Sequence, residues 1–402
     1  MKKIIQDFSV SASVAGFVAV LVGFTSSVAI VFQAATQLGA SSTQIASWMW
    51  ALGLSMGLCS ALPSWWLKKP VMVAWSTPGA AVLAVAGATG HYTLSQAVGA
   101  FMICGLLTVI VGLTGWFDAI IKRIPVAIAN ALLAGVLAKF GLQAFGMLQF
   151  NLSLVISMLL TYWFVKQLAP RWAITTSLVV AIVMVYLQGQ LNVQQLHLEL
   201  ATPQAVWPTF TFAALMGLAL PLWIVTMASQ NLPGVAAINA CGYGGDQGIP
   251  VSKVISLTGL FTLVLAPFGC FSVNLSAITA AICMGPEAHE DPKKRYIAAI
   301  VCGVIYVGIG IFGATVALIL AAFPTVLIVV IAGLALLATI GNSLASALEN
   351  TVHREAALVT FLVCLSGITL MGIGSAFWGV VAGLFAMYLP HGLQQIKNKI
   401  QK

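Results

Sequence analysis

Two stretches, Pro70 to Gly79 and Pro267 to Ser276, interrupt long apolar segments of this chain in matching places. Each begins with a proline, continues with residues that suit an extended strand, and then reaches Ser, Thr or Asn, the residues that begin helices. The pattern therefore predicts a strand followed by a half-helix in both places. A bilayer tolerates extended backbone only where protein or a water-filled cavity satisfies its N–H and C=O groups. We expect a buried site between the two breaks, an arrangement typical of transporters.

Composition indicates that these breaks lie within a membrane. Of the 402 residues, 60% are hydrophobic and 6% are charged, against roughly 25% charged in soluble domains. Apolar stretches near the ~20 residues that span hydrocarbon recur from Val10 to Leu389. The first is too long for the core of a signal peptide, so we expect a retained helix. The sequence predicts an all-α polytopic protein embedded in a lipid bilayer, with no separately folded soluble domain.

Basic residues predict the topology of the chain. Fourteen transmembrane segments are expected, at 9–34, 43–62, 76–90, 93–115, 120–146, 150–168, 171–188, 209–231, 250–270, 274–285, 295–318, 323–343, 355–370 and 373–390. With the N-terminus in the cytoplasm, every Lys and Arg except Lys139 falls on the cytoplasmic side, as the positive-inside rule requires. These loops account for the net charge of +8, so no nucleic-acid partner is expected. Both termini are predicted to lie in the cytoplasm, below a bacterial inner membrane.

The two breaks also indicate an internal repeat. Shifting the chain by 197 residues (267 minus 70) pairs the two leading prolines and also pairs Gln33 with Gln230. The expected repeats are 1–190 and 205–391, with seven segments in each. Because seven is odd, the second repeat must enter the membrane from the opposite face, which makes the repeat inverted. The alternative is chance similarity among helices rich in Ala, Gly and Leu.

An inverted repeat would aim the N-termini of both half-helices at one central cavity. Each N-terminus carries about half an elementary charge and unpaired N–H donors, so a small anion could bind without a buried Arg or Lys. The candidate substrate-binding residues lie in the breaks and in polar clusters of the first and eighth segments. They are Gln33, Thr36, Trp75, Ser76, Thr77, Ser229, Gln230, Asn231, Phe271, Ser272, Asn274 and Ser276.

Two of these assignments have simpler alternatives. We expect Thr77 and Asn274 to cap the half-helices, and added contact with substrate is left open for both. The cluster at 229–231 has the alternative role of joining helices through side-chain hydrogen bonds.

Titratable residues give no sign of an enzyme. Every Asp, Glu and His falls in a loop or near a segment end, and neither H-E-x-x-H nor C-x-x-C occurs. The chain is therefore predicted to bind no metal and no cofactor and to catalyse no reaction, and the sequence identifies no proton relay. Lys139 is expected to extend to the outer interface; the alternative is that it draws anions into an outer vestibule.

The interrupted third and tenth segments, together with Met227 to Gly234 and Pro267 to Ser276, resemble the bacterial benzoate:proton symporter family over essentially the whole chain. Nucleobase and sulfate permeases are more distantly similar and share a seven-plus-seven inverted repeat divided into a core and a gate domain. The nucleobase permeases carry acidic residues in the eighth and tenth segments. This chain has Ser229-Gln230 and Ala277 to Thr279 at these places, which argues against nucleobase transport.

The resemblance implies a division into two domains with substrate between them, and a homodimer by analogy with other members of the fold. The implied core domain is 9–118 with 207–320, and the implied gate domain is 119–190 with 321–390. An uncharged pocket between two helix N-termini suits an aromatic carboxylate, with its ring against Trp75 or Phe271.

We therefore expect secondary active import of benzoate or a related aromatic carboxylate by alternating access, and the resemblance adds proton coupling. The alternatives are an inorganic anion or bicarbonate carrier of the same fold, and an anion channel, which would need a continuous polar pore.

Overall fold

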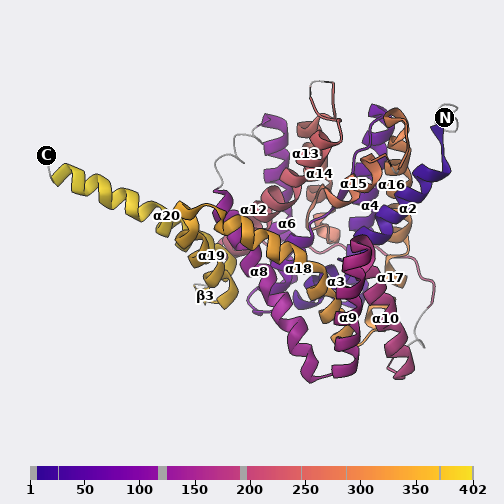
Figure 1. The fold of residues 1–402 in the computed structure, drawn as a ribbon, viewed down its shortest axis with the longest axis horizontal. Helices are drawn as coiled ribbons and strands as arrows, with labels where there is room; N and C mark the ends of the chain where they lie inside the picture. Colours follow the sequence, from indigo (N-terminus) through magenta and orange to yellow (C-terminus); the bar gives the residue numbers. More distant parts are fainter. Residues whose placement is uncertain are drawn as a thin grey trace.

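The computed structural model describes residues 7–25, 27–115, 125–190, 197–245, 247–286, 288–370 and 373–400. Most of this part of the chain is helical, and α20 extends away from the body that the other helices form (Figure 1). The helices of the first half are α2 (Val10–Thr25), α3 (Val28–Gln37), α4 (Ser42–Leu67), α5 (Thr77–Gly87), α6 (Leu94–Thr114), α8 (Val126–Gly146), α9 (Leu152–Leu168) and α10 (Ala173–Leu187).

The second half begins with one long helix in several parts. Its parts are α11 (Phe212–Ala214), the π-helical stretch η3 (Leu215–Ala219), α12 (Leu220–Thr226), the π-helical stretch η4 (Met227–Asn231) and α13 (Leu232–Ala240). The other helices of this half are α14 (Val251–Leu265), α15 (Ile278–Met284), α16 (Tyr296–Ile311), α17 (Gly313–Ala321), α18 (Thr325–Glu349), α19 (Arg354–Ser366) and α20 (Ser375–Ile400). Short 3₁₀ turns are η1 (Met147–Gln149), η2 (Pro170–Trp172), η5 (Ala266–Phe268), η6 (Pro292–Lys294) and η7 (Thr351–His353).

Eight helical stretches among the described residues are long and apolar enough to cross a membrane. They are Val10–Gln37, Ser42–Leu67, Leu94–Thr114, Val126–Gln149, Phe212–Ala240, Val251–Phe268, Pro292–Ile311 and Thr325–Glu349. Shorter apolar helices lie at Thr77–Gly87, Leu152–Leu168, Ala173–Leu187 and Ser375–Leu389. The chain is thus a helical membrane protein, and the count of fourteen spans stays a prediction. Residues 120–124 of the fifth expected segment and residues 1–6 and 401–402 at the termini lie outside the described residues.

A short antiparallel ladder joins the two breaks in the buried interior. Strand β1 (Val73–Trp75) pairs with β2 (Val273–Leu275), so that Ala74 lies opposite Asn274. The helix α5 follows β1, and α15 follows β2. The ladder therefore brings the starts of both short helices together, although 200 residues separate Ala74 from Asn274 along the chain (274 minus 74). A second ladder pairs β3 (Thr369–Leu370) with β4 (Ile373–Gly374) between α19 and α20.

Serine side chains of α4 satisfy the free edge of β1. The Oγ atom of Ser64 accepts a hydrogen bond from the Val71 N–H at 2.8 Å, and the Oγ atom of Ser60 accepts one from the Val73 N–H at 3.0 Å. Ser60 and Ser64 are one helical turn apart and therefore share one face of α4. This face replaces the missing neighbouring strand, because unpaired backbone groups are costly inside a membrane.

The edge of β2 is satisfied by two different elements. The Thr262 hydroxyl of α14 accepts a hydrogen bond from the Val273 N–H at 3.2 Å. The Oδ1 atom of Asn231, in η4, accepts one from the Leu275 N–H at 3.0 Å. Asn231 is fully buried, so its amide acts within the protein.

Helices from the two halves of the chain pack against each other in matched pairs. Helix α4 packs along α16, α6 packs along α14, and α8 packs along α18. In the expected segment numbering, the first pair joins the second and eleventh segments, and the second pair joins the ninth and fourth. If the two halves are exchanged, so that each segment takes the number of its counterpart seven places away, the first pair becomes the second pair. Glycines allow the close approach of α4 to α16: a Cβ atom at Gly57 would lie 2.5 Å from the carbonyl oxygen of Gly303.

The eighth expected segment, 209–231, is too short, because the helix continues to Ala240. Pro233 disfavours continuation of a regular α-helix, since proline cannot donate a backbone hydrogen bond and clashes with the carbonyl four residues earlier. The structure avoids this clash with wider turns: η3 ends two residues before Pro221, and η4 ends two residues before Pro233. A π turn accommodates proline without ending the helix.

Two other expected segments are divided. The segment predicted at 9–34 contains α2, which ends at Thr25, and α3, which begins after its N-cap Ser27 and runs to Gln37. The segment predicted at 295–318 consists of α16 and α17, which Phe312 separates. The Ser27 hydroxyl donates to the Gly23 carbonyl at 2.9 Å, a local bond that competes with the regular helical pattern.

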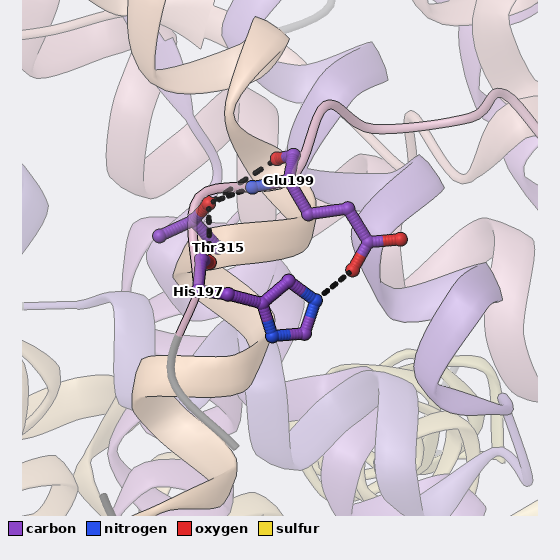
Figure 2. Close-up of polar contacts among 3 residues, drawn as sticks. All are labelled: His197, Glu199 and Thr315. Atoms are coloured by element: carbon purple, nitrogen blue, oxygen red, sulfur yellow. Dashed lines mark hydrogen bonds and ion pairs between the residues drawn. The ribbon is translucent and has the colours of Figure 1, made fainter. Parts of the chain in front are cut away.

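The polar interval after α10 ends in an extended strap over several helices. Its Glu199 N–H donates to the Thr315 hydroxyl of α17 at 2.9 Å, and the exposed side chains of His197 and Glu199 form a hydrogen bond of 3.1 Å (Figure 2). Further along, backbone N–H groups donate to groups of α4, η5 and α6. These bonds are Gln204 N to Ser47 Oγ, Val206 N to Pro267 O and Thr209 N to Ser95 O, each 2.9 Å. The strap thereby ties helices of both halves together.

Candidate functional site

A cavity of about 600 Å³ lies where the short helices α5 and α15 begin. Its wall comes from α2, α4, β1, α5, η2, α10, η4, α13, α15, α16 and α18. The polar lining residues are Ser27, Thr77, Thr175, Ser229, Gln230, Ser276, Thr279, Tyr306, Thr339 and Asn342. None of the described residues that line it is an Asp, Glu, His, Lys or Arg. The volume is within the range of about 300–1,000 Å³ that is usual for small-molecule sites.

Trp75, the last residue of β1, supplies the aromatic wall of this inner cavity. Its indole N–H donates to the Ser27 hydroxyl at 2.7 Å, and its ring lies 5.4 Å from the Phe24 ring. These contacts hold the indole in one orientation, which lowers the entropic cost of binding a flat ligand against it.

A serine rather than the expected Thr77 caps α5, and the N-cap residue of α15 is Ala277, which offers no side-chain cap. The Ser76 Oγ accepts from the Gly79 N–H at 3.1 Å, so Ser76 rather than Thr77 is the N-cap of α5. Asn274 lies within β2, and the Ser276 Oγ accepts from the Thr279 N–H at 3.4 Å at the start of α15. The prediction of caps at Thr77 and Asn274 was therefore wrong.

Contacts between distant segments explain the shift. The Ser76 hydroxyl also accepts from the Thr226 hydroxyl at 2.8 Å, which fixes it behind the cavity wall. The Asn274 amide, oriented to satisfy its hydrogen bonds, accepts from the Ser76 N–H at 3.0 Å across the ladder. Both groups are fully buried and hold the two breaks together.

Three backbone amides remain available at the inner cavity. The N–H groups of Thr77, Ala277 and Ile278 have no hydrogen-bond partner among the described residues, and all three residues line the cavity. They are the first amides of α5 and of the turn that begins α15, where a helix leaves its N–H groups unpaired. An anion in the cavity could accept hydrogen bonds from them.

The structure divides the other expected site residues into two groups. Ser229, Gln230 and Ser276 line the inner cavity together with Trp75 and Thr77. The other expected site residues of the breaks and of η4 do not line the inner cavity and are almost fully buried. They are Ser76, Asn231, Phe271, Ser272 and Asn274. The Phe271 ring packs 6.0 Å from Trp48 and 6.2 Å from Phe101.

Gln33 and Thr36 lie elsewhere. Gln33 lines a second cavity of about 430 Å³, and its buried Oε1 atom has no hydrogen-bond partner among the described residues. Thr36 is exposed, lines neither cavity, and donates to the Phe32 carbonyl of its own helix at 2.9 Å.

Sequence reasoning missed the lining residues of α16 and α18. Thr339 and Asn342 are three residues apart and therefore lie on one face of α18, toward the inner cavity. Polar residues at this spacing in an apolar segment were the available signal. Tyr306 offered no such signal, because aromatic residues are common in apolar segments.

Comparison with known proteins agrees with this architecture. The family model of the benzoate membrane transport protein BenE matches residues 6–389. This chain belongs to the BenE family. The resemblance to benzoate symporters is therefore confirmed at the level of the family.

Two relatives of this BenE-family chain are similar along almost their whole length. The inner membrane protein YdcO of Escherichia coli K12 is 48% identical over 369 residues, which cover 92% of this chain and 93% of that protein. The benzoate membrane transport protein of Acinetobacter baylyi is 35% identical over 389 residues, which cover 97% of each.

Solved structures show the same fold in more distant proteins. The transmembrane domain of the cyanobacterial bicarbonate transporter BicA matches with a TM-score of 0.55 at 13% identity, covering 93% of this BenE-family chain and 97% of that one. SLC26A9 matches with a TM-score of 0.62 at 12% identity, covering 97% of this chain and 66% of that one. At these identities the likeness concerns the fold alone.

Proposed function

We propose that this protein is a secondary active transporter that imports benzoate or a related aromatic carboxylate across the bacterial inner membrane. The observation that carries the proposal is the inner cavity, which combines an oriented aromatic wall with unpaired backbone amides and no charged side chain among the described lining residues. The name of the Acinetobacter relative supports benzoate as the substrate, and the name of the E. coli relative supports the inner membrane.

The proposed binding mode uses both breaks. The carboxylate accepts hydrogen bonds from the amides of Thr77, Ala277 and Ile278, and the aromatic ring packs against Trp75. The side chains of Gln230 and Ser276, which line the same cavity, supply further donors. A helix N-terminus stabilises a bound anion by up to ~2 kcal/mol in a partly buried setting. Neutral donors of this strength suit a carrier, because they bind the substrate and still allow its release.

We further propose that the halves form an inverted repeat, divided into a core domain (9–118 with 207–320) and a gate domain (119–190 with 321–390). The matched packing of α4 with α16 and of α6 with α14 supports the repeat. The strap after α10 supports the core as one body, because it bonds to α4, α6 and α17, all of the proposed core. Movement of the core against the gate would expose the inner cavity alternately to each side.

Proton coupling, a homodimer and cytoplasmic termini complete the proposal. The described lining residues include no carboxylate or imidazole, so either the substrate carries the proton or an acidic residue near a loop does. The dimer follows from the resemblance to other proteins of the fold, and the orientation follows from the distribution of Lys and Arg.

Uptake of labelled benzoate into proteoliposomes tests the function. With an inward proton gradient we expect accumulation above the equilibrium level, and a protonophore should abolish it. Failure to accumulate benzoate under a gradient in an otherwise folded preparation would contradict the proposal.

The bicarbonate or inorganic anion carrier is the second candidate, and the fold shared with BicA favours it. Competition separates the two candidates: unlabelled benzoate, but not sulfate or bicarbonate, should inhibit uptake. An ion current far above carrier turnover would instead indicate an anion channel.

A further inference from the structure

The second cavity holds a lysine whose charge no described group balances. Lys139 of α8 lines this cavity, and it is the only Lys or Arg among the described residues that line either cavity. Its ammonium group forms no ion pair or hydrogen bond with any described residue. Lys139 is only partly exposed. A partly buried ammonium without a counter-charge is costly, so this arrangement favours an anionic ligand.

The Lys139 ammonium group lies close to Gly367, which lines the same cavity. A Cβ atom at Gly367 would lie 2.6 Å from the Lys139 Nζ, and Gly367 has φ +72. Gly367 is the left-handed residue that ends α19, and the carbonyl end of a helix attracts a cation. This position favours the alternative of an outer vestibule over extension of Lys139 to the outer interface.

The walls of the second cavity match an aromatic carboxylate. Gln33, Gln37 and Gln143 line the same cavity as Lys139 and carry amide N–H donors. Val85 and Phe140 also line this cavity and supply apolar surface. A lining that combines polar donors with apolar carbon is what an amphipathic anion requires.

Helix α5 connects the two cavities. Pro78, near its start, lines the inner cavity, and Ala84, half-way along, lines the second. Six residues of helix span about 9 Å at 1.5 Å per residue. Between these two positions along the helix, Ala80, Ala81 and Leu83 are fully buried and line neither cavity.

We propose that the second cavity is an outer docking site, in which Lys139 captures the carboxylate substrate before the core moves and admits it to the inner cavity. The proposal rests on the proposed function for the identity of the substrate. It assigns to Lys139 a role in capture from the outside, separate from the neutral donors that bind the substrate at the inner cavity.

Transport kinetics test the capture step. In proteoliposomes, Lys139→Gln should raise the KM for external benzoate by about tenfold, the lower end of what electrostatic focusing provides, while kcat changes by less than about twofold. The KM of the wild-type protein should rise with ionic strength, and that of the variant should not. Lys253→Gln is the matched control, because Lys253 is exposed and lines neither cavity. An unchanged KM in Lys139→Gln would overturn the proposal.

A second measurement needs no transport. Gln143 is exposed, lines the same cavity one helical turn from Lys139, and can be changed in a Cys241→Ser background, since the other cysteines are buried. The thiol of Gln143→Cys is modified from outside with an anionic and with a cationic methanethiosulfonate, and the ratio of the anionic rate to the cationic rate is measured. This ratio should be high when Lys139 is present, because its ammonium group attracts the anionic reagent. Adding Lys139→Gln should lower this ratio by about tenfold.

The two measurements separate the hypotheses. If the wild-type protein accumulates no benzoate, the proposed function fails, while a thiol ratio that depends on Lys139 still supports an anion site. If benzoate is accumulated but the ratio does not depend on Lys139, the outer docking site is wrong and the proposed function stands.

Discussion

The two breaks that meet in the β1–β2 ladder have the same topology but are supported differently. The free edge of β1 is bonded by a single helix, α4, whereas the edge of β2 is bonded by α14 and by η4. Their aromatic residues also differ: Trp75 lines the inner cavity, and Phe271 packs in the core. The comparison teaches that two breaks with similar backbone arrangements can both line one cavity while only the first turns its aromatic ring toward it.

Substitutions of the residues that lead into the two breaks should have the largest effect on the stability of the protein. Helix α4 ends with Lys68 at φ 54, and η5 ends with Gly269 at φ +99. A Cβ atom at Gly269 would lie 1.9 Å from Cδ1 of the buried Trp48. Gly269→Ala therefore adds a severe clash to the ~1–2 kcal/mol of left-handed strain, and we expect loss of folded protein, measured by size-exclusion chromatography and thermal unfolding in detergent.

Two control variants isolate the clash. Gly39 has φ +79 and open space around its Cβ position, so Gly39→Ala should show the backbone strain alone. At the first break, Lys68→Gly relieves backbone strain but loses a cation–π contact of 4.7 Å with Tyr296. Because these two effects oppose each other, we expect only a small net change in thermal stability. Equal losses for Gly269→Ala and Gly39→Ala would contradict the steric argument.

The second effect concerns the hydrogen bond between η4 and β2. Asn231→Leu keeps a similar volume but leaves the Leu275 N–H without its acceptor in a fully buried place. Such an unsatisfied donor costs about 1–3 kcal/mol, so we expect a clearly lower midpoint of thermal unfolding. Ser60→Ala should have a comparable effect at the first break, because it removes the acceptor of the Val73 N–H.

A cavity-lining residue of the same stretch provides the control. Among the described residues, the Ser229 hydroxyl bonds only to the Val225 carbonyl of its own helix, so Ser229→Ala should leave the unfolding midpoint almost unchanged. If Asn231→Leu were as stable as Ser229→Ala, the supporting role of Asn231 in the ladder would be refuted.

Local sequence indicated much of the architecture. The apolar composition predicted a helical membrane protein, and the pattern around Pro267 to Ser276 led to the family that comparison confirmed. Trp75, Thr77, Ser229, Gln230 and Ser276, all predicted to bind substrate, line one cavity; their contact with substrate stays a prediction. These assignments depend on short stretches of chain, which is why a single sequence sufficed.

The remaining features depend on contacts between distant segments. Thr226 fixes the Ser76 hydroxyl from 150 residues away, and Asn231 bonds to the edge of β2 rather than lining the cavity. Neither arrangement leaves a local signal in the sequence. A Ser, Thr or Asn reads the same in the sequence whether it caps a helix, bonds to a strand edge or binds a ligand. Depth in the fold, which follows from packing, decides among these roles.

The third effect compares the aromatic residues of the two breaks directly. Trp75→Leu removes the ring that we propose contacts the substrate, and a stacking contribution of about 0.5–1.5 kcal/mol corresponds to a roughly twofold to tenfold weaker affinity for benzoate. Trp75→Phe keeps a ring but loses the 2.7 Å bond to Ser27, so an intermediate loss is expected. Equilibrium binding of labelled benzoate to purified protein measures both.

Phe271→Leu is the matched variant at the second break. Because Phe271 is fully buried beside Trp48 and Phe101, the substitution should lower thermal stability through lost packing while the affinity of the folded protein stays the same. An affinity loss in Phe271→Leu equal to that of Trp75→Leu would mean that both breaks contribute their ring to the ligand, and the asymmetry between them would disappear.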